Sequence, residues 1–275
     1  MTKYAVLGNP IAQSKSPLIH SLFAKQTDQE MSYEAISLDE GEFDAFVRNF
    51  FAEGGGGLNV TVPYKEKAYA LATSCSPRAE LAKAVNTLFI DGEGELCGDN
   101  TDGIGLVTDI KINHGVSIEG RRVLMLGAGG AVRGVLAAFA YEGAATLTVV
   151  NRTFSKAEVL ADEFKSVAAV EALSYEELQH AADAGRNFDL IINGTSSSLQ
   201  GDLPQLDQKL IATQCCCYDL MYAMDDTPFV QWGKRSGAAS SIDGLGMLVE
   251  QAAEAFAIWR GVRPQTAPVI AALRS

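Results

Sequence analysis

The stretch LNVTVPYKEKA, residues 58–68, places a lysine where it could move a proton. A β-branched run ends at Pro63, and Lys65 follows two residues later. A lysine at the mouth of a strand can serve as an acid or a base, whereas a lysine on the next helix is an ordinary solvated charge. Lys67 fits the second description, and the segment by itself leaves both interpretations open for Lys65.

Short polar segments follow several predicted strands in the first third of the chain, at 8–17, 59–65, 84–87 and 98–103. In an open α/β sheet, ligands gather at the carboxyl ends of the strands. Ser14 and Ser16 precede a predicted helix, where two hydroxyls beside free N–H groups could cradle a carboxylate. N-capping by itself would explain Ser16.

Asn59, Thr61 and Asn86 are polar residues in otherwise apolar strands. Buried polar groups need partners, and either the protein or a polyhydroxylated ligand could supply them. Protein partners are the commoner case for any one of these residues. Their occurrence together with Lys65 and Asp102 favours a ligand.

A second candidate site is the segment VLMLGAGGAVRGVLAAF, 123–139, which reads as an apolar strand, a glycine turn and a helix. Glycines let the backbone approach a pyrophosphate, and a helix N-terminus offers it free N–H groups. Gly127 and Gly129 fit the G-x-G-x-x-G pattern, but Val132 occupies its third position, so this signal is weak by itself.

The next predicted strand, 146–150, ends in Asn151, Arg152 and Thr153. Sites for NAD usually carry an acidic residue here to bind the ribose 2′-hydroxyl. This chain has Arg152 instead, with Lys156 four residues on, and these two cations suit a 2′-phosphate. The pattern therefore predicts NADP(H), against the alternative of two solvated charges at a helix start.

Strands and helices that alternate along the chain predict an α/β fold with parallel sheets. Strands are expected at 3–8, 32–38, 58–62, 146–150 and 188–194, and 84–100 reads as a hairpin. Helices are expected at 16–26, with Ser16 as N-cap, and at 42–53, 102–113, 132–144, 155–164 and about 244–259, and Pro63 is expected to open another. We place domain boundaries near residues 102 and 243.

Composition removes several classes of function. A net charge of −12 disfavours a nucleic-acid partner. Three scattered histidines and five cysteines without C-x-x-C spacing predict no metal site and no disulfide framework, but reduced thiols in the cytoplasm. No apolar run is long enough for a membrane span, and the N-terminus has no leader-like segment.

Several segments, taken in order, resemble the shikimate dehydrogenase family over nearly the whole chain. They are SKSP (14–17), NVTVPYKE (59–66), AVNT (84–87), GDNTDG (98–103), GAGGA (127–131), NRT (151–153), NGTS (193–196), YDLMY (218–222), TPF (227–229) and DGLGMLVEQA (243–252). The resemblance implies reversible NADPH-dependent reduction of 3-dehydroshikimate to shikimate, a step of chorismate and aromatic amino acid biosynthesis. It implies a Rossmann-type NADP domain, 102–243, and a split α/β substrate domain with a mostly parallel sheet, 1–101 and 244–275. A monomer or a homodimer would suit the chain.

The resemblance also assigns roles at matching positions. Lys65 would be the catalytic acid/base with Asp102 as its partner, both at the reacting C3 oxygen or its neighbour. The residues implied for the substrate carboxylate are Ser14, Ser16 and Tyr218, and those for the ring hydroxyls are Asn59, Thr61, Asn86 and Gln251. The residues implied for NADP are Gly127, Ala128, Gly129, Gly130, Ala131, Asn151, Arg152, Thr153, Phe154, Ser155, Lys156, Thr195, and the main chain near Cys216 and Gly244.

Two departures from the family pattern affect the cofactor contacts. A serine follows the Thr195-Ser196 pair where glycine is common, and Cys216 stands at the position expected beside the nicotinamide. The main alternative is a quinate/shikimate dehydrogenase with relaxed cofactor use, against which Arg152 and Lys156 argue. A non-catalytic NADP-binding regulator on the same fold is expected to lack Lys65 or Asp102, and this chain has both.

Overall fold

The computed structural model describes residues 1–195 and 206–274 and contains two compact units. One unit consists of Met1–Gly105 and Leu248–Ser275, and the other of Leu106–Met247. The observed divisions therefore lie after residues 105 and 247, compared with the predicted boundaries near 102 and 243. Asp102 belongs to the first unit because the helix that it begins packs there. A Cβ added at Gly105 of this helix would lie only 2.7 Å from the Cβ of Gln251.

The first unit is built on a six-stranded sheet in the order β2-β1-β3-β5-β6-β4. Its strands are β1 (Thr2–Gly8), β2 (Met31–Ser37), β3 (Gly57–Val60), β4 (Ser74–Cys75), β5 (Thr87–Ile90) and β6 (Leu96–Asp99). The β1–β2, β1–β3 and β4–β6 pairs are parallel, and the β3–β5 and β5–β6 pairs are antiparallel. The sheet is thus mostly parallel, and β5 and β6 form the predicted hairpin.

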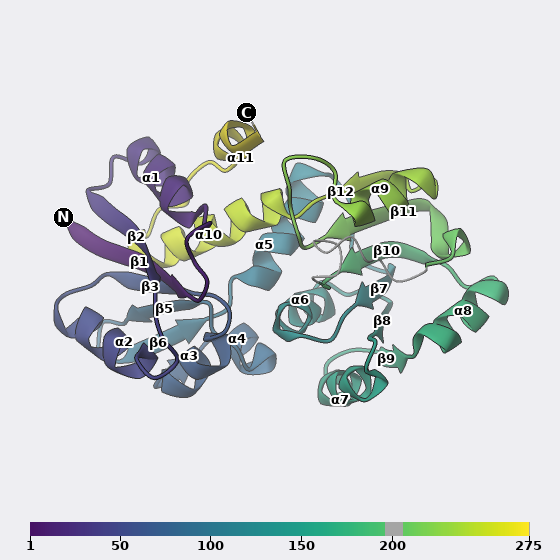
Figure 1. The fold of residues 1–275 in the computed structure, drawn as a ribbon, viewed down its shortest axis with the longest axis horizontal. Coiled ribbons are helices and arrows are strands. Elements are labelled where there is room, and N and C mark those ends of the chain that lie inside the picture. Colours follow the sequence, from purple (N-terminus) through teal and green to yellow (C-terminus); the bar gives the residue numbers. More distant parts are fainter. Residues whose placement is uncertain (196–205, 275) are drawn as a thin grey trace. The chain divides into compact units, whose positions relative to one another are not determined.

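Helices cover both faces of this sheet (Figure 1). They are α1 (Ser16–Gln26), α2 (Phe43–Ala52), α3 (Lys65–Leu71), α4 (Pro77–Ala82), α10 (Leu245–Arg260) and α11 (Ala267–Arg274). One core joins α2, α3 and α4 to sheet residues such as Leu58 and Leu88. A second core joins α1, α10 and α11 through Phe23, Phe256 and Val269, so the last helices pack onto the unit that contains the N-terminus.

The second unit has a six-stranded parallel sheet in the order β12-β11-β10-β7-β8-β9. Its strands are β7 (Arg122–Leu126), β8 (Thr146–Val150), β9 (Val170–Leu173), β10 (Phe188–Asn193), β11 (Ile211–Asp219) and β12 (Ser240–Ile242). Numbered within the unit, this order is 3-2-1-4-5-6, that of the Rossmann fold. The direction of chain progress reverses between β7 and β10, and ligands of such sheets bind at this switch point.

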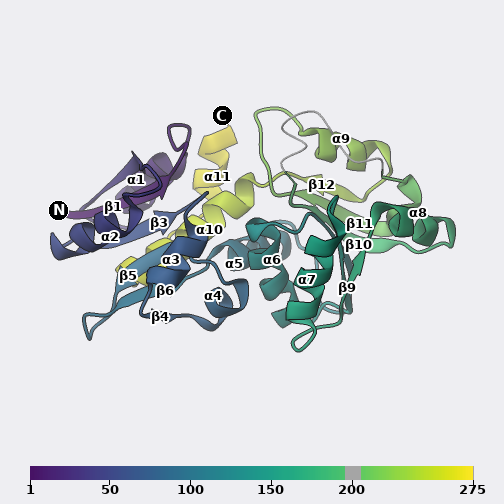
Figure 2. The same ribbon diagram turned by 60° about the horizontal axis from the view of Figure 1, so that its bottom comes forward.

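The second unit's helices are α5 (Asp102–Thr108, begun in the first unit), the π-helix η1 (Asp109–Asn113), α6 (Gly130–Tyr141), α7 (Phe154–Phe164), α8 (Tyr175–Asp183), the 3₁₀-helix η3 (Gln208–Leu210) and α9 (Pro228–Arg235). Figures 1 and 2 show α6 and α7 on one side of the sheet and α8 and α9 on the other. The α8–α9 side packs Leu178 and Phe229 against Leu124, Ile191 and Cys217.

Two local predictions are wrong. Ser16 does not cap α1, because the cap position is Lys15 and it is the Ser14 hydroxyl oxygen that accepts the Ser16 N–H, at 3.3 Å. Pro63 does not open a helix, since it lies in a turn and α3 begins at Lys65. The predicted helix 102–113 is confirmed: it is an α-helix to Thr108 and continues as the π-helix η1.

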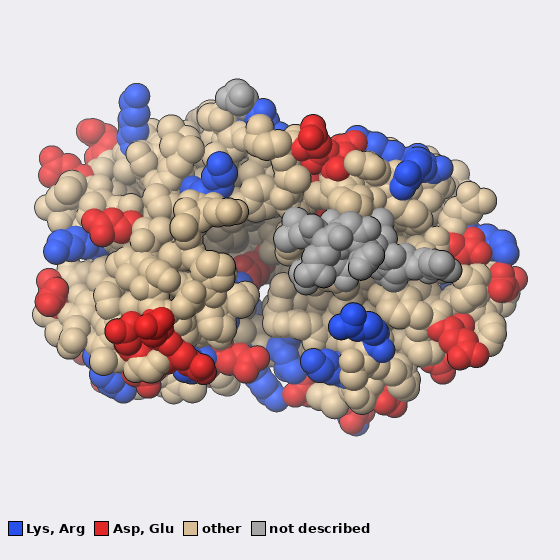
Figure 3. All heavy atoms as spheres, viewed as in Figure 1, with Lys and Arg blue, Asp and Glu red and all other residues tan. Residues whose placement is uncertain are grey.

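Acidic and basic side chains are interspersed over the face of the molecule that Figure 3 shows. Among the described residues, none of the helices has the length and apolar character needed to cross a lipid bilayer.

Candidate functional site

Lys65 and Asp102 form an ion pair in the first unit. Lys65 is the first residue of α3 and Asp102 the first of α5, and the Lys65 Nζ lies 2.5 Å from the Asp102 Oδ2. The two side chains are 21% and 11% exposed, so water screens the pair only partly. The structure therefore joins the two residues predicted to handle the proton, which are 37 positions apart in the sequence.

Asn86 holds the other oxygen of the Asp102 carboxylate. Its Nδ2 donates to the Asp102 Oδ1 at 2.8 Å, and its Oδ1 accepts the backbone N–H of Thr101 at 2.9 Å. The Gln251 Oε1 lies 3.4 Å from both the Asn86 Nδ2 and the Thr101 hydroxyl. Both carboxylate oxygens of Asp102 thus accept from fixed donors, which gives the carboxylate one orientation. Thr101, which is fully buried, is a site residue that the sequence analysis did not identify.

Asn59 is buried and its amide is occupied by protein partners. Its Nδ2 donates to the Asn86 carbonyl at 3.1 Å and to the Thr87 hydroxyl at 3.2 Å. Its Oδ1 accepts the Tyr33 hydroxyl at 2.7 Å. The protein thus supplies acceptors for both amide hydrogens of Asn59, as it does for those of the buried Asn86.

Ser14 and Thr61 lie in the loops at the carboxyl ends of β1 and β3. The Thr61 N–H donates to the Leu7 carbonyl at 2.9 Å, and both residues are partly exposed. The loops approach closely because residue 8 is glycine: a Cβ there would lie 2.6 Å from the Thr61 Cγ2. Because Ser14 accepts from Ser16, its own hydroxyl hydrogen is available to a ligand.

In the second unit, the glycine turn after β7 brings the backbone close to the end of β10. Gly127 has φ +108°, and a Cβ there would lie 3.3 Å from the carbonyl carbon of Gly194. Gly129 and Gly130 are exposed at the start of α6, and no side-chain hydrogen bond caps this helix. This is the expected cradle for a pyrophosphate at the switch point. Ala128 and Ala131 complete it and are partly exposed.

The loop after β8 presents two cations without competing acids. Arg152 and Lys156 are exposed, and within the described part of the chain neither forms an ion pair. The Asn151 side chain donates to the Thr153 carbonyl at 2.9 Å and so shapes the loop, which continues through the exposed Ser155 and the partly buried Phe154 into α7. These residues fit a 2′-phosphate, because the guanidinium and ammonium groups are free to bind one.

The carboxyl ends of β10 and β11 are tied together by buried polar groups. The Asn193 Oδ1 accepts the Thr195 hydroxyl at 2.7 Å, and the Asn193 Nδ2 donates to the Asp219 Oδ1 at 3.0 Å. Gly244 packs against this edge, where a Cβ would lie 2.4 Å from the Leu220 carbonyl oxygen. Thr195 and Gly244 are thus held at the ligand-binding edge of the sheet. The chain just beyond Thr195, including the serine noted above, lies outside the described residues.

Two predicted contacts do not agree with the structure. Tyr218 is fully buried, and its hydroxyl donates to the Asp109 Oδ2 at 2.7 Å and accepts the Met247 N–H at 3.2 Å, so it cannot reach a substrate carboxylate. Cys216 lies inside β11, three residues before its end, with neighbours paired on both sides, and burial raises the pKa of its thiol to about 11. Tyr222, partly exposed just beyond β11, is the tyrosine of that segment that remains accessible.

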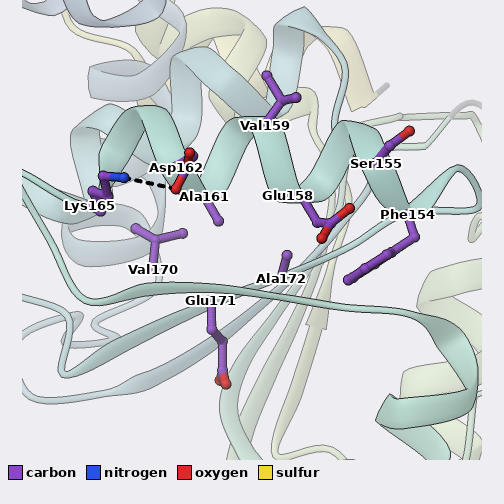
Figure 4. A pocket seen from close by; sticks show the side chains of 10 residues that line it. All are labelled: Phe154, Ser155, Glu158, Val159, Ala161, Asp162, Lys165, Val170, Glu171 and Ala172. Atoms are coloured by element: carbon purple, nitrogen blue, oxygen red, sulfur yellow. Dashed lines mark hydrogen bonds and ion pairs between the residues drawn. The ribbon is translucent and has the colours of Figure 1, made fainter.

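A groove of about 630 Å³ lies between α7 and β9 (Figure 4). Phe154, Val170 and Ala172 supply its apolar surface, and Glu158 and Asp162 its acidic edge. It contains none of the residues that would make up the proton-handling site. Among the described residues, no cluster of His, Cys, Asp or Glu side chains could hold a metal ion.

Comparisons with known proteins agree with this geometry. The family model described as shikimate dehydrogenase substrate binding domain matches residues 6–88, that of shikimate/quinate 5-dehydrogenase matches 110–201, and that of the shikimate 5′-dehydrogenase C-terminal domain matches 244–274. Shikimate dehydrogenase (NADP(+)) from Alkalilimnicola ehrlichii is 53% identical over 272 residues, which cover 99% of this chain and 98% of that protein.

Solved structures are similar over the full chain. The Ael1 enzyme from Pseudomonas putida has a TM-score of 0.93 and 45% identity, with coverage of 100% of this chain and 99% of that one. Shikimate 5-dehydrogenase from Thermus thermophilus, in complex with NADP(H) and shikimate, has a TM-score of 0.86 and 32% identity, with the same coverage. With the sequence match, these likenesses lead to one conclusion: the chain belongs to the shikimate dehydrogenase family.

Proposed function

We propose that this chain is a shikimate 5-dehydrogenase, which interconverts shikimate and 3-dehydroshikimate with NADP(H) as cofactor. The ion pair between Lys65 and Asp102 carries this proposal. It lies at the ends of β3, β5 and β6, and Asn86 orients its carboxylate. Family membership supports the substrate and the cofactor, since the 53% identical relative bears the name shikimate dehydrogenase (NADP(+)).

Lys65 and Asp102 supply the proton chemistry in this proposal. When shikimate is oxidised, Lys65 as the free amine takes the proton of the C3 hydroxyl. In the reverse direction Lys65 as the ammonium returns it to the developing alkoxide. Asp102 accepts a hydrogen bond from Lys65 and so aims the amine. Bound NADP(H) would supply or accept the hydride.

Substrate binding is assigned to the polar residues around this pair. Ser14 and Ser16 would hold the carboxylate, while Asn59, Thr61, Asn86 and Gln251 would bind ring hydroxyls. The Ser14 hydroxyl hydrogen, which has no acceptor in the described contacts, supports the first assignment. The position of Gln251 beside Asn86 and Thr101 supports the second.

The cofactor would be held by the second unit. The turn Gly127–Ala131 would receive the pyrophosphate, and Arg152 and Lys156 the 2′-phosphate, with Asn151, Thr153, Phe154 and Ser155 around the ribose. Thr195 and Gly244 would line the path toward the nicotinamide. The bound 2′-phosphate would explain why an arginine replaces the acidic residue at the end of β8.

A direct assay tests the proposal. Purified protein with shikimate and NADP⁺ is expected to form NADPH, followed by its absorbance, and to consume it with 3-dehydroshikimate. NAD⁺ in place of NADP⁺ should give at least about tenfold lower kcat/KM, since the loop after β8 lacks an acid for the 2′-hydroxyl. Quinate in place of shikimate should also react more slowly. Equal rates with quinate and NAD⁺ would instead support the relaxed quinate/shikimate enzyme.

We infer further that the protein works in the cytoplasm, where its five cysteines, all free, would stay reduced. A monomer and a homodimer are both compatible with the proposed site, because all residues assigned to the proton and the substrate lie on one chain. Sedimentation of the purified protein distinguishes them.

A further inference from the structure

We propose that Tyr33 is a positioning residue of the substrate site: its phenol, clamped by the ring of His20, holds Ser16 and Asn59 in place and thereby sets the affinity for a ring that bears a carboxylate. This inference rests on the proposed function and adds to it a residue outside every motif on which the family resemblance is based.

The Tyr33 hydroxyl bridges two residues assigned to the substrate site. It donates to the Asn59 Oδ1 at 2.7 Å. Burial raises the pKa of the phenol well above its ordinary value, and a hydrogen bond with the Ser16 side chain opposes that rise. Ser16 lies at the start of α1 and Asn59 within β3, and 43 positions of sequence separate them. Tyr33 on β2 therefore links the carboxylate side of the site to its ring side.

The phenol has little freedom to move. The rings of His20 and Tyr33 are stacked, with centroids 4.1 Å apart and planes within 6°. Trp259 lies beside both rings and is itself fixed, because its indole N–H donates to the Leu88 carbonyl at 3.2 Å. The backbone of β3 packs directly against the Trp259 indole. A Cβ at Gly57 would lie only 2.3 Å from the indole nitrogen, so the indole has no room to move in that direction.

His20 is suited to hold an aromatic ring rather than to carry charge. It is fully buried, and burial lowers the pKa of its imidazole to about 3, outweighing the opposite effect of the nearby Asn59 side chain, so the ring is neutral at physiological pH. Neither ring nitrogen has a hydrogen-bond partner of good geometry among the described residues. Burial of a polar ring without hydrogen-bond partners is costly. On the side that faces the substrate site, the imidazole contacts the protein by stacking on Tyr33.

The consequence for binding follows from the connections of Asn59 and Ser16. Loss of the Tyr33 hydroxyl leaves the Asn59 Oδ1 without its donor and lets the Ser16 side chain take other rotamers. The Lys65–Asp102 ion pair keeps its own bonds in such a variant, because Tyr33 is not among them. We therefore expect weaker ground-state and transition-state binding alike, which raises KM and leaves kcat nearly unchanged.

The experiment compares Tyr33→Phe with the matched variant Tyr4→Phe in steady-state assays. Tyr4 is the register partner of Tyr33 and also packs on Trp259, but its hydroxyl accepts from Arg260, at 3.3 Å. Tyr33→Phe should raise the KM for shikimate about 5- to 30-fold, with kcat and the KM for NADP⁺ within about twofold of wild type. Tyr4→Phe should change none of these constants more than about twofold.

A double-mutant cycle separates positioning from general loosening. In a Ser16→Ala background the effect of Tyr33→Phe on KM should shrink by at least about threefold, because Tyr33 then has one fewer group to hold. An unchanged KM in Tyr33→Phe, or full additivity with Ser16→Ala, overturns the inference. If the wild-type protein itself fails to oxidise shikimate, the proposed function fails instead, so the two failures are distinguishable.

Discussion

The substitution Asp102→Asn should be far from conservative, although it removes no heavy atom. The carboxylate accepts the Lys65 Nζ at 2.5 Å on one oxygen and the Asn86 Nδ2 at 2.8 Å on the other. An asparagine must place its NH₂ group against one of these donors, whichever way the amide is turned. Either the lysine loses its acceptor or Asn86 does, and a donor faces a donor.

The magnitude follows from the bonds at stake. A hydrogen bond to a charged group contributes about 1.5–3 kcal/mol, which corresponds to a roughly 10- to 150-fold change in an equilibrium or rate. Little of this should be lost to solvent screening, because the Lys65 and Asp102 side chains are 21% and 11% exposed. We expect kcat/KM for shikimate to fall by that factor, mainly through kcat, while the KM for NADP⁺ stays within about threefold of wild type.

Steady-state kinetics at fixed pH measures this effect, with Asp91→Asn as the control. Asp91 lies in the exposed β5–β6 turn, and its Oδ1 accepts two backbone N–H groups, which an asparagine oxygen can still do. The control should retain wild-type rates. An Asp102→Asn enzyme with more than about a third of wild-type kcat/KM would show that the carboxylate charge does not orient the lysine.

Two further predictions concern the cofactor and the buried histidine. Arg152→Ala should weaken NADP⁺ binding about 10- to 100-fold and leave NAD⁺ binding nearly unchanged, because only NADP⁺ loses a charge-assisted contact; equal losses in titrations with the two cofactors would refute the 2′-phosphate role. The pKa of His20 is about 3 in the folded protein and 6.5 for the free side chain. Between pH 6.5 and pH 3 the unfolded chain therefore binds one more proton than the folded protein does. The free energy of unfolding falls as the pH drops through this range. At about pH 5 the loss should be about 2 kcal/mol relative to about pH 7.5. Urea unfolding should show a correspondingly shallower acid dependence for His20→Phe, and identical pH slopes for wild type and variant would contradict the burial argument.

The sequence allowed prediction wherever the chemistry is local. The glycines of the turn after β7, the arginine in place of an acid after β8, and the hairpin of β5 and β6 all follow from residues within a few positions of one another. The fold class follows in the same way, since regular alternation of strands and helices leaves few topologies. The pairing of Lys65 with Asp102 was inferred from family resemblance and is seen directly as an ion pair.

Features that depend on distant contacts were missed. YDLMY contains two tyrosines that look alike in sequence, but β11 continues through Asp219, so Tyr218 points into the core toward Asp109 and Tyr222 stays accessible. A strand buried on both faces has no polar alternation that would reveal its register. Thr101 and Tyr33 were overlooked for a similar reason: each acquires its role from partners 15 or more positions away.

The central claim is that Lys65 carries the proton in this reaction, and the kinetics of Lys65→Ala test it most directly. Measured with saturating NADP⁺, kcat for shikimate oxidation should fall about 10²- to 10⁴-fold, the usual contribution of acid–base catalysis, while the KM for shikimate changes much less. A variant with near wild-type kcat and a KM raised about tenfold or more would make Lys65 a binding residue only, and a variant with neither change would make it a surface charge.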